Sequence, residues 1–134
     1  GLLECETSLE PEKQLRNVTG SLQLPGAPAF TGYEIHMGAT RGAALQRAAA
    51  LFADGRSDGA QSADGQIIAS YCHGLFDHPD ALNGLLAWAG MTSPLRTDFA
   101  LRREADIERL ADATEAALDW EILDPLLIRK RNHD

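Results

Sequence analysis

The hydrophobic periodicity of the chain changes near residue 79, and this change limits the folds that the sequence can adopt. Before that point, apolar and polar residues alternate over short runs such as Phe30 to Met37, as in a strand with two different faces. After it, apolar residues recur at positions i, i+3, i+4 and i+7, which is typical of an amphipathic helix. Strands followed by helices predict an α/β layered domain, or the later part of one.

Turn residues divide the first part of the chain into short strands. Residues 1–24 predict two strands that meet at Pro11–Glu12 as an antiparallel β-ribbon near the N-terminus, and two prolines predict a loop over residues 25–28. The alanines of residues 42–52 favour a helix, although the end of this segment fits a short buried strand equally well. Asp-Gly pairs predict a loop or hairpin over residues 56–65.

The first predicted helix begins at Pro79. Asp77 or His78 would cap it, since proline fits the first helical turn, where no N–H partner is needed. Gly90 would end it.

Further helices are predicted towards the C-terminus. One extends from about Arg103 to Leu118, and a short last helix, capped by Asp119, would contain Ile122 and Leu126. The apolar stripe of the longer helix consists of Ile107, Leu110, Ala111, Thr114, Ala117 and Leu118. The basic residues 129–131 are expected to be a solvated tail.

Length and charge exclude several classes of protein. The chain has 134 residues, which fits one domain, and 12 Lys and Arg against 20 Asp and Glu give a formal net charge of −8. Nucleic acid and anionic membranes repel such a chain, so neither is an expected partner. We expect no membrane span and no signal peptide. Two cysteines, Cys5 and Cys72, argue against a disulfide framework and indicate a reducing compartment, so we expect a cytoplasmic protein.

His73 is the strongest candidate for chemistry. It follows a predicted buried strand over residues 66–71 and precedes Gly74. In open α/β sheets ligands bind beyond the carboxyl ends of the strands, and a histidine there can carry protons near neutral pH. The alternative is a histidine held by backbone groups at a strand end, and it stays open on these residues alone.

Neither cysteine is expected to be a nucleophile. Cys72 is adjacent to His73, and neighbouring residues of a strand point to opposite faces, so we expect Cys72 to be a small buried apolar residue. Cys5 lies between Glu4 and Glu6, whose charges disfavour a thiolate.

Other polar residues offer weaker candidates. Glu34 and His36 share one face of their predicted strand, and they could be an acid–base pair or a substrate contact, although a salt-bridged pair facing a neighbouring element is favoured. His73, Asp77 and His78 fit no metal-ligand spacing, so we expect no metal. The sequence contains neither phosphate-binding glycine motif and no Gly-x-Ser-x-Gly turn.

Two segments resemble signature segments of the cobyric acid synthase family, within its C-terminal glutamine amidotransferase domain. They are Gly32–Gly38, with the sequence Gly-Tyr-Glu-Ile-His-Met-Gly, and Tyr71–Asp77, with the sequence Tyr-Cys-His-Gly-Leu-Phe-Asp. Flanking residues extend the resemblance over nearly the whole chain, including Gly1–Leu3, Val18–Gly20, Asp58–Ala60 and Arg109–Asp112. The resemblance implies a flavodoxin-like layered domain of the class I amidotransferase type, of which residues 1–134 are the later part.

The resemblance also implies a chemistry. In the family, a cysteine attacks the side-chain amide of glutamine and a histidine acts as base and then as acid; His73 would be that histidine, and Tyr33, Glu34 and His36 would contact substrate. The ammonia would pass to a synthetase domain in the N-terminal part of the same polypeptide. That domain would bind ATP and Mg²⁺ and amidate corrinoid side-chain carboxylates in adenosylcobalamin biosynthesis. We expect no cofactor in the present segment.

The chain departs from the family pattern at two points. The glycine-flanked nucleophilic cysteine is absent, so we expect a fragment that is inactive alone and is completed by an upstream segment. Many class I amidotransferases carry a glutamate two residues after the histidine, where this chain has Leu75, as the cobyric acid synthase branch does. The residue that orients His73 is thus open, and the segment from Glu34 to His36 is one possibility.

Related families offer alternatives. The a,c-diamide synthase and the cell-wall amidotransferase of similar fold carry variants of the Gly-Tyr-Glu segment, but His36–Gly38 and Leu75–Asp77 favour the cobyric acid synthase family. A non-catalytic binding module of the same fold and a histidine-based metal protein are the alternatives from other classes.

Overall fold

The computed structural model describes residues 1–95, 99–123 and 125. The chain divides into two compact units, residues 1–97 and residues 98–134. Each unit is described by itself below. The expectation of one domain over residues 1–134 stays a prediction.

The first unit is a mixed α/β structure with antiparallel sheets. In its described residues a five-stranded sheet has the order β4-β3-β1-β2-β7, and β5 pairs with β6 in a separate two-stranded sheet. Every pairing is antiparallel. The strands are β1 (Glu6–Leu22), β2 (Ala29–Arg41), β3 (Ala50–Phe52), β4 (Ser57–Asp58), β5 (Ala60–Gln61), β6 (Ile68–Ala69) and β7 (Cys72–His73).

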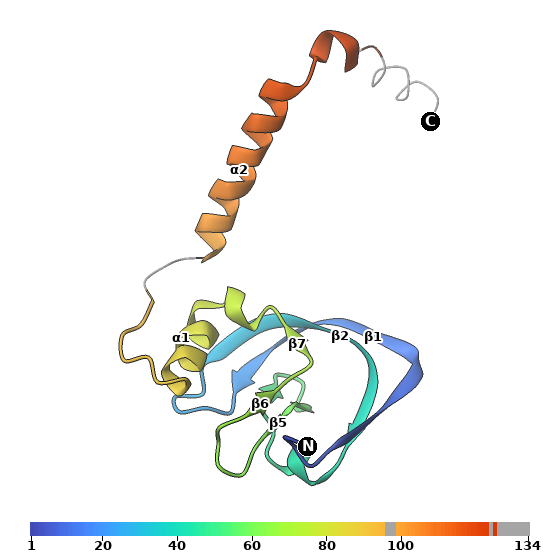
Figure 1. The fold of residues 1–134 in the computed structure, drawn as a ribbon, viewed down its shortest axis with the longest axis vertical. Coiled ribbons are helices and arrows are strands. Elements are labelled where there is room, and N and C mark those ends of the chain that lie inside the picture. Colours follow the sequence, from blue (N-terminus) through green and yellow to red (C-terminus); the bar gives the residue numbers. More distant parts are fainter. Residues whose placement is uncertain (96–98, 124, 126–134) are drawn as a thin grey trace. The chain divides into compact units, whose positions relative to one another are not determined.

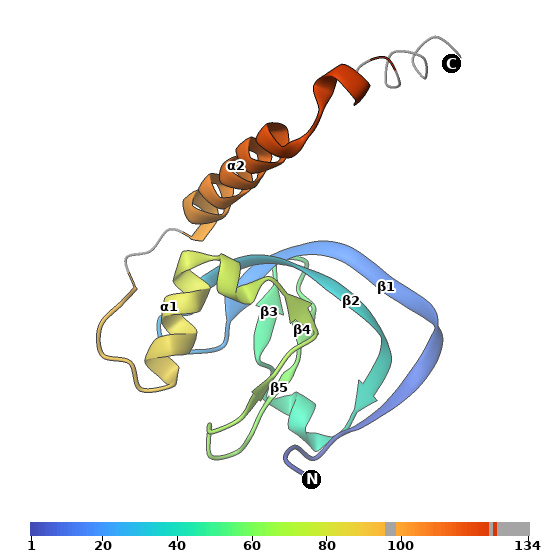
Figure 2. The same cartoon turned by 45° about the horizontal axis from the view of Figure 1, so that its top comes forward.

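The long strands β1 and β2 form the ribbon near the N-terminus, but not as predicted. The two segments expected to meet at Pro11–Glu12 belong to one strand, β1, and both pair with β2. The register shifts between Leu9 and Gln14, so four residues of β1 lie opposite Met37 of β2. Proline has no N–H for a ladder hydrogen bond and is tolerated at such a bulge. β1 and β2 bend together around the shorter strands (Figures 1 and 2).

The region after β2 confirms some turn predictions and corrects others. Residues 43–46 form a 3-10 helix, η1 (Ala43–Gln46), and the strand β3 follows. The helix and the short buried strand that were both considered for residues 42–52 thus each occupy one part of that segment. The Asp-Gly region forms the β3–β4 and β5–β6 hairpins. The continuous buried strand expected over residues 66–71 is wrong, because only Ile68–Ala69 is a strand there and Ala69 is exposed.

The core lies on the inner face of the β1–β2 sheet. Val18 and Leu22 of β1 pack with Phe30 of β2, and the Phe30 and Phe52 rings meet edge to face with centroids 6.0 Å apart. Burial of each such side chain stabilises the fold by roughly 1.5–3 kcal/mol. Ala81, from the helix α1 (Pro79–Trp88) described below, also belongs to this cluster.

The helix α1 (Pro79–Trp88) confirms the prediction of a helix that begins at Pro79. It follows a short 3-10 helix, η2 (Leu75–Asp77), and its N-cap is His78, although the His78 side chain makes no capping hydrogen bond. The chain turns out of the helix at Gly90, which has a φ of 97°, as expected.

The second unit contains α2 (Phe99–Ala117), which begins four residues before the predicted start at Arg103. Its apolar stripe is exposed within this unit, as at Ile107 and Leu110. The Asp119 carboxylate accepts a hydrogen bond from the backbone N of Ile122 at 3.4 Å, as predicted for its cap. Leu126 and residues 129–131 lie outside the described residues.

Candidate functional site

His73 lies on β7, at the end of the five-stranded order, directly opposite Tyr33 of β2. Two glycines permit this arrangement. A Cβ at Gly32 would lie 2.3 Å from the carbonyl oxygen of His73, so a glycine is needed where β7 approaches β2. Gly74 has a φ of 82°, which lets the chain leave the strand immediately after His73. The Gly-Tyr-Glu and Cys-His-Gly triplets therefore pair side by side.

The rings of His73 and Tyr33 stack on the exposed face of this strand pair. Their centroids are 5.3 Å apart and their planes differ by 6°. Tyr33 is 40% exposed, and His73 is exposed as well. The imidazole is thus open to a reactant while an aromatic neighbour packs against part of one of its faces.

Cys72 lies on the opposite face of β7 and belongs to the core. It is 8% exposed, and its thiol donates a hydrogen bond to the carbonyl oxygen of His73 at 3.5 Å. Burial, followed by the negative charges of Asp58 and Glu34, raises the pKa of the Cys72 thiol to about 11. The structure confirms that Cys72 is a buried apolar residue on the face away from the imidazole.

Glu34 is a buried charge on the inner face. It is 4% exposed and accepts hydrogen bonds from Nη1 and Nη2 of Arg56 at 3.2 and 2.9 Å. Nε of Arg16 lies 3.5 Å from one carboxylate oxygen, and Nε2 of His36 lies 3.7 Å from the other. A buried carboxylate needs such donors because burial alone disfavours its charge. Glu34 therefore belongs to a salt bridge, as favoured from the sequence, and its principal partner is Arg56 rather than His36.

Arg56 connects the β3–β4 turn to β2. Its Nε donates a hydrogen bond to Asp54 at 2.8 Å, and its guanidinium carbon lies 4.9 Å from the centre of the Phe52 ring. Hydrogen bonds to Glu34 and then to Asp54 raise the pKa of Arg56 above its ordinary value. The backbone N–H of Arg56 and then its guanidinium lower the pKa of Asp54. Arg56 is therefore a fixed positive charge that holds Glu34 in place.

His36 lies further along β2 on the same inner face. Its ring stacks on Tyr71 with centroids 4.4 Å apart, and its Nδ1 lies 2.9 Å from the carbonyl oxygen of Gly38. The Tyr71 hydroxyl lies 2.7 Å from Oγ1 of Thr40, which in turn lies 2.7 Å from Oγ1 of Thr7. These three hydroxyl groups form one hydrogen-bonded cluster.

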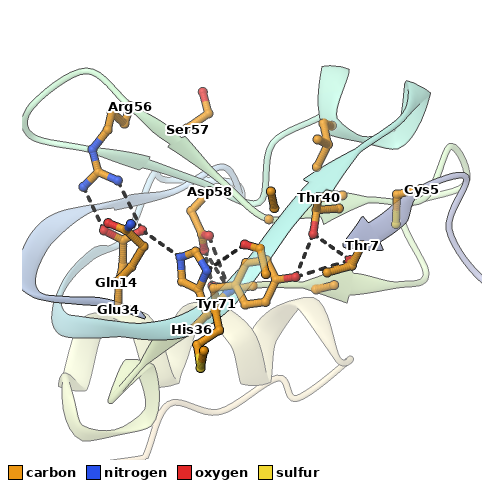
Figure 3. A pocket seen from close by; sticks show the side chains of 18 of the residues that line it. Cys5, Thr7, Gln14, Glu34, His36, Thr40, Arg56, Ser57, Asp58 and Tyr71 are labelled. Carbon is orange, nitrogen blue, oxygen red and sulfur yellow. Dashed lines mark hydrogen bonds and ion pairs between the residues drawn. The ribbon is translucent and has the colours of Figure 1, made fainter. Parts of the chain in front are cut away.

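The inner-face residues line a cavity of about 730 Å³ (Figure 3). The Arg56–Glu34 pair lies at one end, the hydroxyl cluster lies towards the other, and Cys5 lies beyond that cluster. Asp58, which is 6% exposed, accepts hydrogen bonds from the Ser70 hydroxyl and from the backbone N of residue 71. Since these polar groups pair mainly with one another, the chain itself fixes the shape of the cavity.

The residues selected from the sequence divide between two faces. His73 and Tyr33 share the outer face, whereas Glu34 and His36 share the inner face with the cavity. The alternation along β2 causes this separation. The structure therefore does not bring Glu34 or His36 to the imidazole, and the possibility that they orient His73 has no support in their contacts.

Sequence reasoning missed several inner-face residues. Arg56 lies in a predicted turn region, and Asp58 and Tyr71 lie in segments that resemble the family, but a linear pattern does not show which charged or polar side chains are neighbours in space. A buried glutamate does require a cation, and this requirement was the available signal for Arg56.

The described part of the chain contains no cluster of metal-binding residues. No three or more His, Cys, Asp or Glu residues lie together there as a metal site needs, which includes His73, Asp77 and His78. Nδ1 of His78 is buried without a hydrogen-bond partner. In that same part, no helix is long and apolar enough to span a membrane.

Comparison with protein families identifies a match. The family model described as the CobB/CobQ-like glutamine amidotransferase domain matches residues 1–81. No solved structure matches the chain. The matched residues contain all the strands of the first unit described above, the cavity and His73.

Proposed function

The chain belongs to the CobB/CobQ-like glutamine amidotransferase domain family, and from that premise we propose that it is part of a cobyric acid synthase and supplies the catalytic histidine, His73. Glutamine amidotransferase function in general follows from the family. The finer assignment rests on the residues of the two paired segments.

The observation that carries the proposal is the pairing of β2 with β7. The segments Gly32–Gly38 and Tyr71–Asp77 lie far apart in the sequence, yet Tyr33 lies opposite His73 and Glu34 opposite Cys72. His73 is exposed, and its strand is followed at once by a glycine turn. This placement supports a histidine that serves a reactant rather than one that only supports a strand end.

In the proposed reaction, a cysteine thiol loses its proton to the His73 imidazole and attacks the side-chain carbonyl carbon of glutamine. The imidazolium returns the proton to the departing amide nitrogen, which leaves as ammonia. His73 then takes a proton from water as the water attacks the thioester. The imidazolium returns that proton to the departing thiolate, which releases glutamate and the free thiol. Glutamine and water thus give glutamate and ammonia.

The nucleophilic thiol comes from outside these residues in our proposal. Cys72 faces the core with a raised pKa, and Cys5 lines the inner-face cavity. The outer edge of β7 has no strand partner among the described residues. A strand that adds there, bringing a cysteine on a tight turn, would extend the sheet towards the flavodoxin-like layering of class I amidotransferases.

The remaining parts of the proposal concern the rest of the enzyme. The ammonia would serve a synthetase domain that binds ATP and Mg²⁺ and activates corrinoid side-chain carboxylates. That domain would lie N-terminal in the same polypeptide, in the cytoplasm. This chain contributes no phosphate-binding glycine motif of its own.

The test uses the complete enzyme, in which this chain is joined to the segments that supply the thiol and the synthetase. His73→Ala should reduce glutamine-dependent amidation of a corrinoid polycarboxylate by at least about a hundredfold, the usual effect of losing a general base. The reaction driven by free ammonia should be unchanged. If both reactions survive, His73 is not the base.

Cys72→Ser is the matched control, because it changes the neighbouring residue on the other face of the strand. It should leave glutamine-dependent activity largely intact. A loss as large as that of His73→Ala would show that Cys72 is the nucleophile. Failure of the complete enzyme to amidate any corrinoid, with glutaminase activity intact, would reject cobyric acid synthase in favour of a related amidotransferase.

A further inference from the structure

The imidazole of His73 has few contacts that could fix its orientation. The position that carries an orienting glutamate in many class I amidotransferases is Leu75, which is 8% exposed and packs in the core. Glu34 and His36 lie on the other face and contact Arg56 and Tyr71. Among the described residues, no hydrogen bond or ion pair to the His73 ring nitrogens is present, and the stack on Tyr33 is the ring's one directional contact.

We propose that Tyr33 is the positioning residue of His73, taking the role that a carboxylate has in other amidotransferases. This inference rests on the proposed catalytic role of His73. An offset parallel stack, with centroids 5.3 Å apart and planes 6° from parallel, restricts rotation of the imidazole about its ring torsion. The tyrosine ring lies against part of one face of the imidazole, and no described residue hydrogen-bonds to the nitrogens at the ring edge. A thiol and a glutamine amide could therefore reach the nitrogens without displacing Tyr33.

The backbone of Tyr33 is well fixed for this task. On one side, Gly32 is in close approach to the carbonyl of His73. On the other side, Glu34 is held by two hydrogen bonds from Arg56. Tyr33 and His73 are direct partners in the β2–β7 register, so the pairing of the two strands places their rings side by side. Tyrosine adds only two side-chain torsions, so little freedom remains once its backbone is set.

The contacts around Gly74 also support a positioning role for Tyr33. A Cβ built at Gly74 would lie 3.7 Å from Cε1 of Tyr33, an ordinary contact distance. The tyrosine ring therefore extends alongside both His73 and the turn that follows it. In this position Tyr33 restricts the movement of both the imidazole and the turn at Gly74.

The first experiment tests the stack on this chain as it is, by NMR of the histidine ring protons. Tyr33→Leu should move the His73 ring protons downfield, because the ring current of a stacked tyrosine shifts them upfield, and Tyr33→Phe should leave them close to their original positions. Tyr71→Leu is the matched control and should shift the His36 protons instead. Unchanged His73 protons in Tyr33→Leu would overturn the proposal.

The second experiment measures catalysis in the complete enzyme. Tyr33→Leu should lower kcat of the glutamine-dependent reaction by roughly ten- to a hundredfold, because a misplaced catalytic group costs rate rather than binding. KM for glutamine and the ammonia-dependent rate should change less than twofold, and Tyr33→Phe should restore kcat. A rise in KM alone would show a substrate contact and overturn the proposal, as would a Tyr33→Phe enzyme as slow as Tyr33→Leu.

The two experiments separate this inference from the proposed function. If His73→Ala retains glutamine-dependent activity, the proposed function fails whatever the NMR result. If His73→Ala is inactive while Tyr33→Leu has normal kcat, the proposed function stands and the positioning role of Tyr33 is wrong.

Discussion

Alkylation of Cys72 tests whether this chain contains its own nucleophile. The folded chain is treated with iodoacetamide near neutral pH, and the modification of each cysteine is followed over time by mass spectrometry of its peptides. Cys72 in the chain unfolded by guanidinium chloride serves as the reference for the same residue. Cys5, which is exposed, should react in both states and shows that the reagent is active.

The size of the effect follows from the environment of the thiol. Burial, followed by the charges of Asp58 and Glu34, raises the pKa of Cys72 from an ordinary 9.0 to about 11. Only the thiolate reacts, and each pKa unit changes its fraction about tenfold below the pKa, so the folded state holds roughly a hundredfold less thiolate. The side chain is also 8% exposed, which slows the reagent further. We therefore expect alkylation of folded Cys72 to be at least about a hundredfold slower than in the unfolded chain.

The reverse result would refute the reasoning. A folded-state rate for Cys72 within about tenfold of the unfolded rate would mean an accessible and activated thiol. Cys72 would then regain its place as a candidate nucleophile, and the requirement for an external cysteine would be lost.

The remaining predictions concern stability, measured by urea unfolding of the chain. Glu34→Gln should reduce the free energy of unfolding by roughly 1.5–3 kcal/mol, because it weakens charge-assisted hydrogen bonds to Arg56. Asp54→Asn, which changes an exposed partner of Arg56, should reduce the free energy of unfolding far less. Equal losses in the two variants would contradict the conclusion that Glu34 and Arg56 form a buried ion pair. The raised pKa of Cys72 means that the folded state binds more protons than the unfolded state between about pH 9 and 11. This contribution to stability is nearly complete below pH 9 and should fall by roughly 2 kcal/mol as pH rises to 11. Cys72→Ala should lack this fall, and a wild-type curve that matches the variant would contradict the pKa shift.

Local patterns predicted the elements whose determinants lie close together in sequence. The alternation from Phe30 to Met37 predicted β2, and Pro79 with Gly90 bounded α1. The same alternation predicted that Cys72 and His73 face opposite sides, which burial confirms. These features depend on backbone sterics and turn chemistry, and a short window of sequence contains both.

Pairing between distant segments could not be predicted in this way. Pro11 indicated a turn between two strands, but β2 is long enough to pair with both sides of a bulge, so the chain continues as one strand. Arg56 is 22 residues from Glu34 in the sequence, with η1 and β3 between them, and the folded sheet brings their side chains together. The candidate site was predicted as one group around His73, whereas tertiary structure divides it between two faces.

The same division determines where a reaction partner of His73 can come from. Both cysteines of this chain are on the inner side, Cys72 in the core and Cys5 on the cavity wall, while the imidazole is on the outer face. A side chain cannot cross a paired strand to the other face, so a thiol for His73 must approach over the outer face or across the open edge of β7. The inner-face charges are already paired, and they hold β2 in the position that presents Tyr33 and His73. The residues that line the cavity therefore influence the outer face only by fixing the position of β2. A substitution among them should change the activity of His73 only if it moves β2.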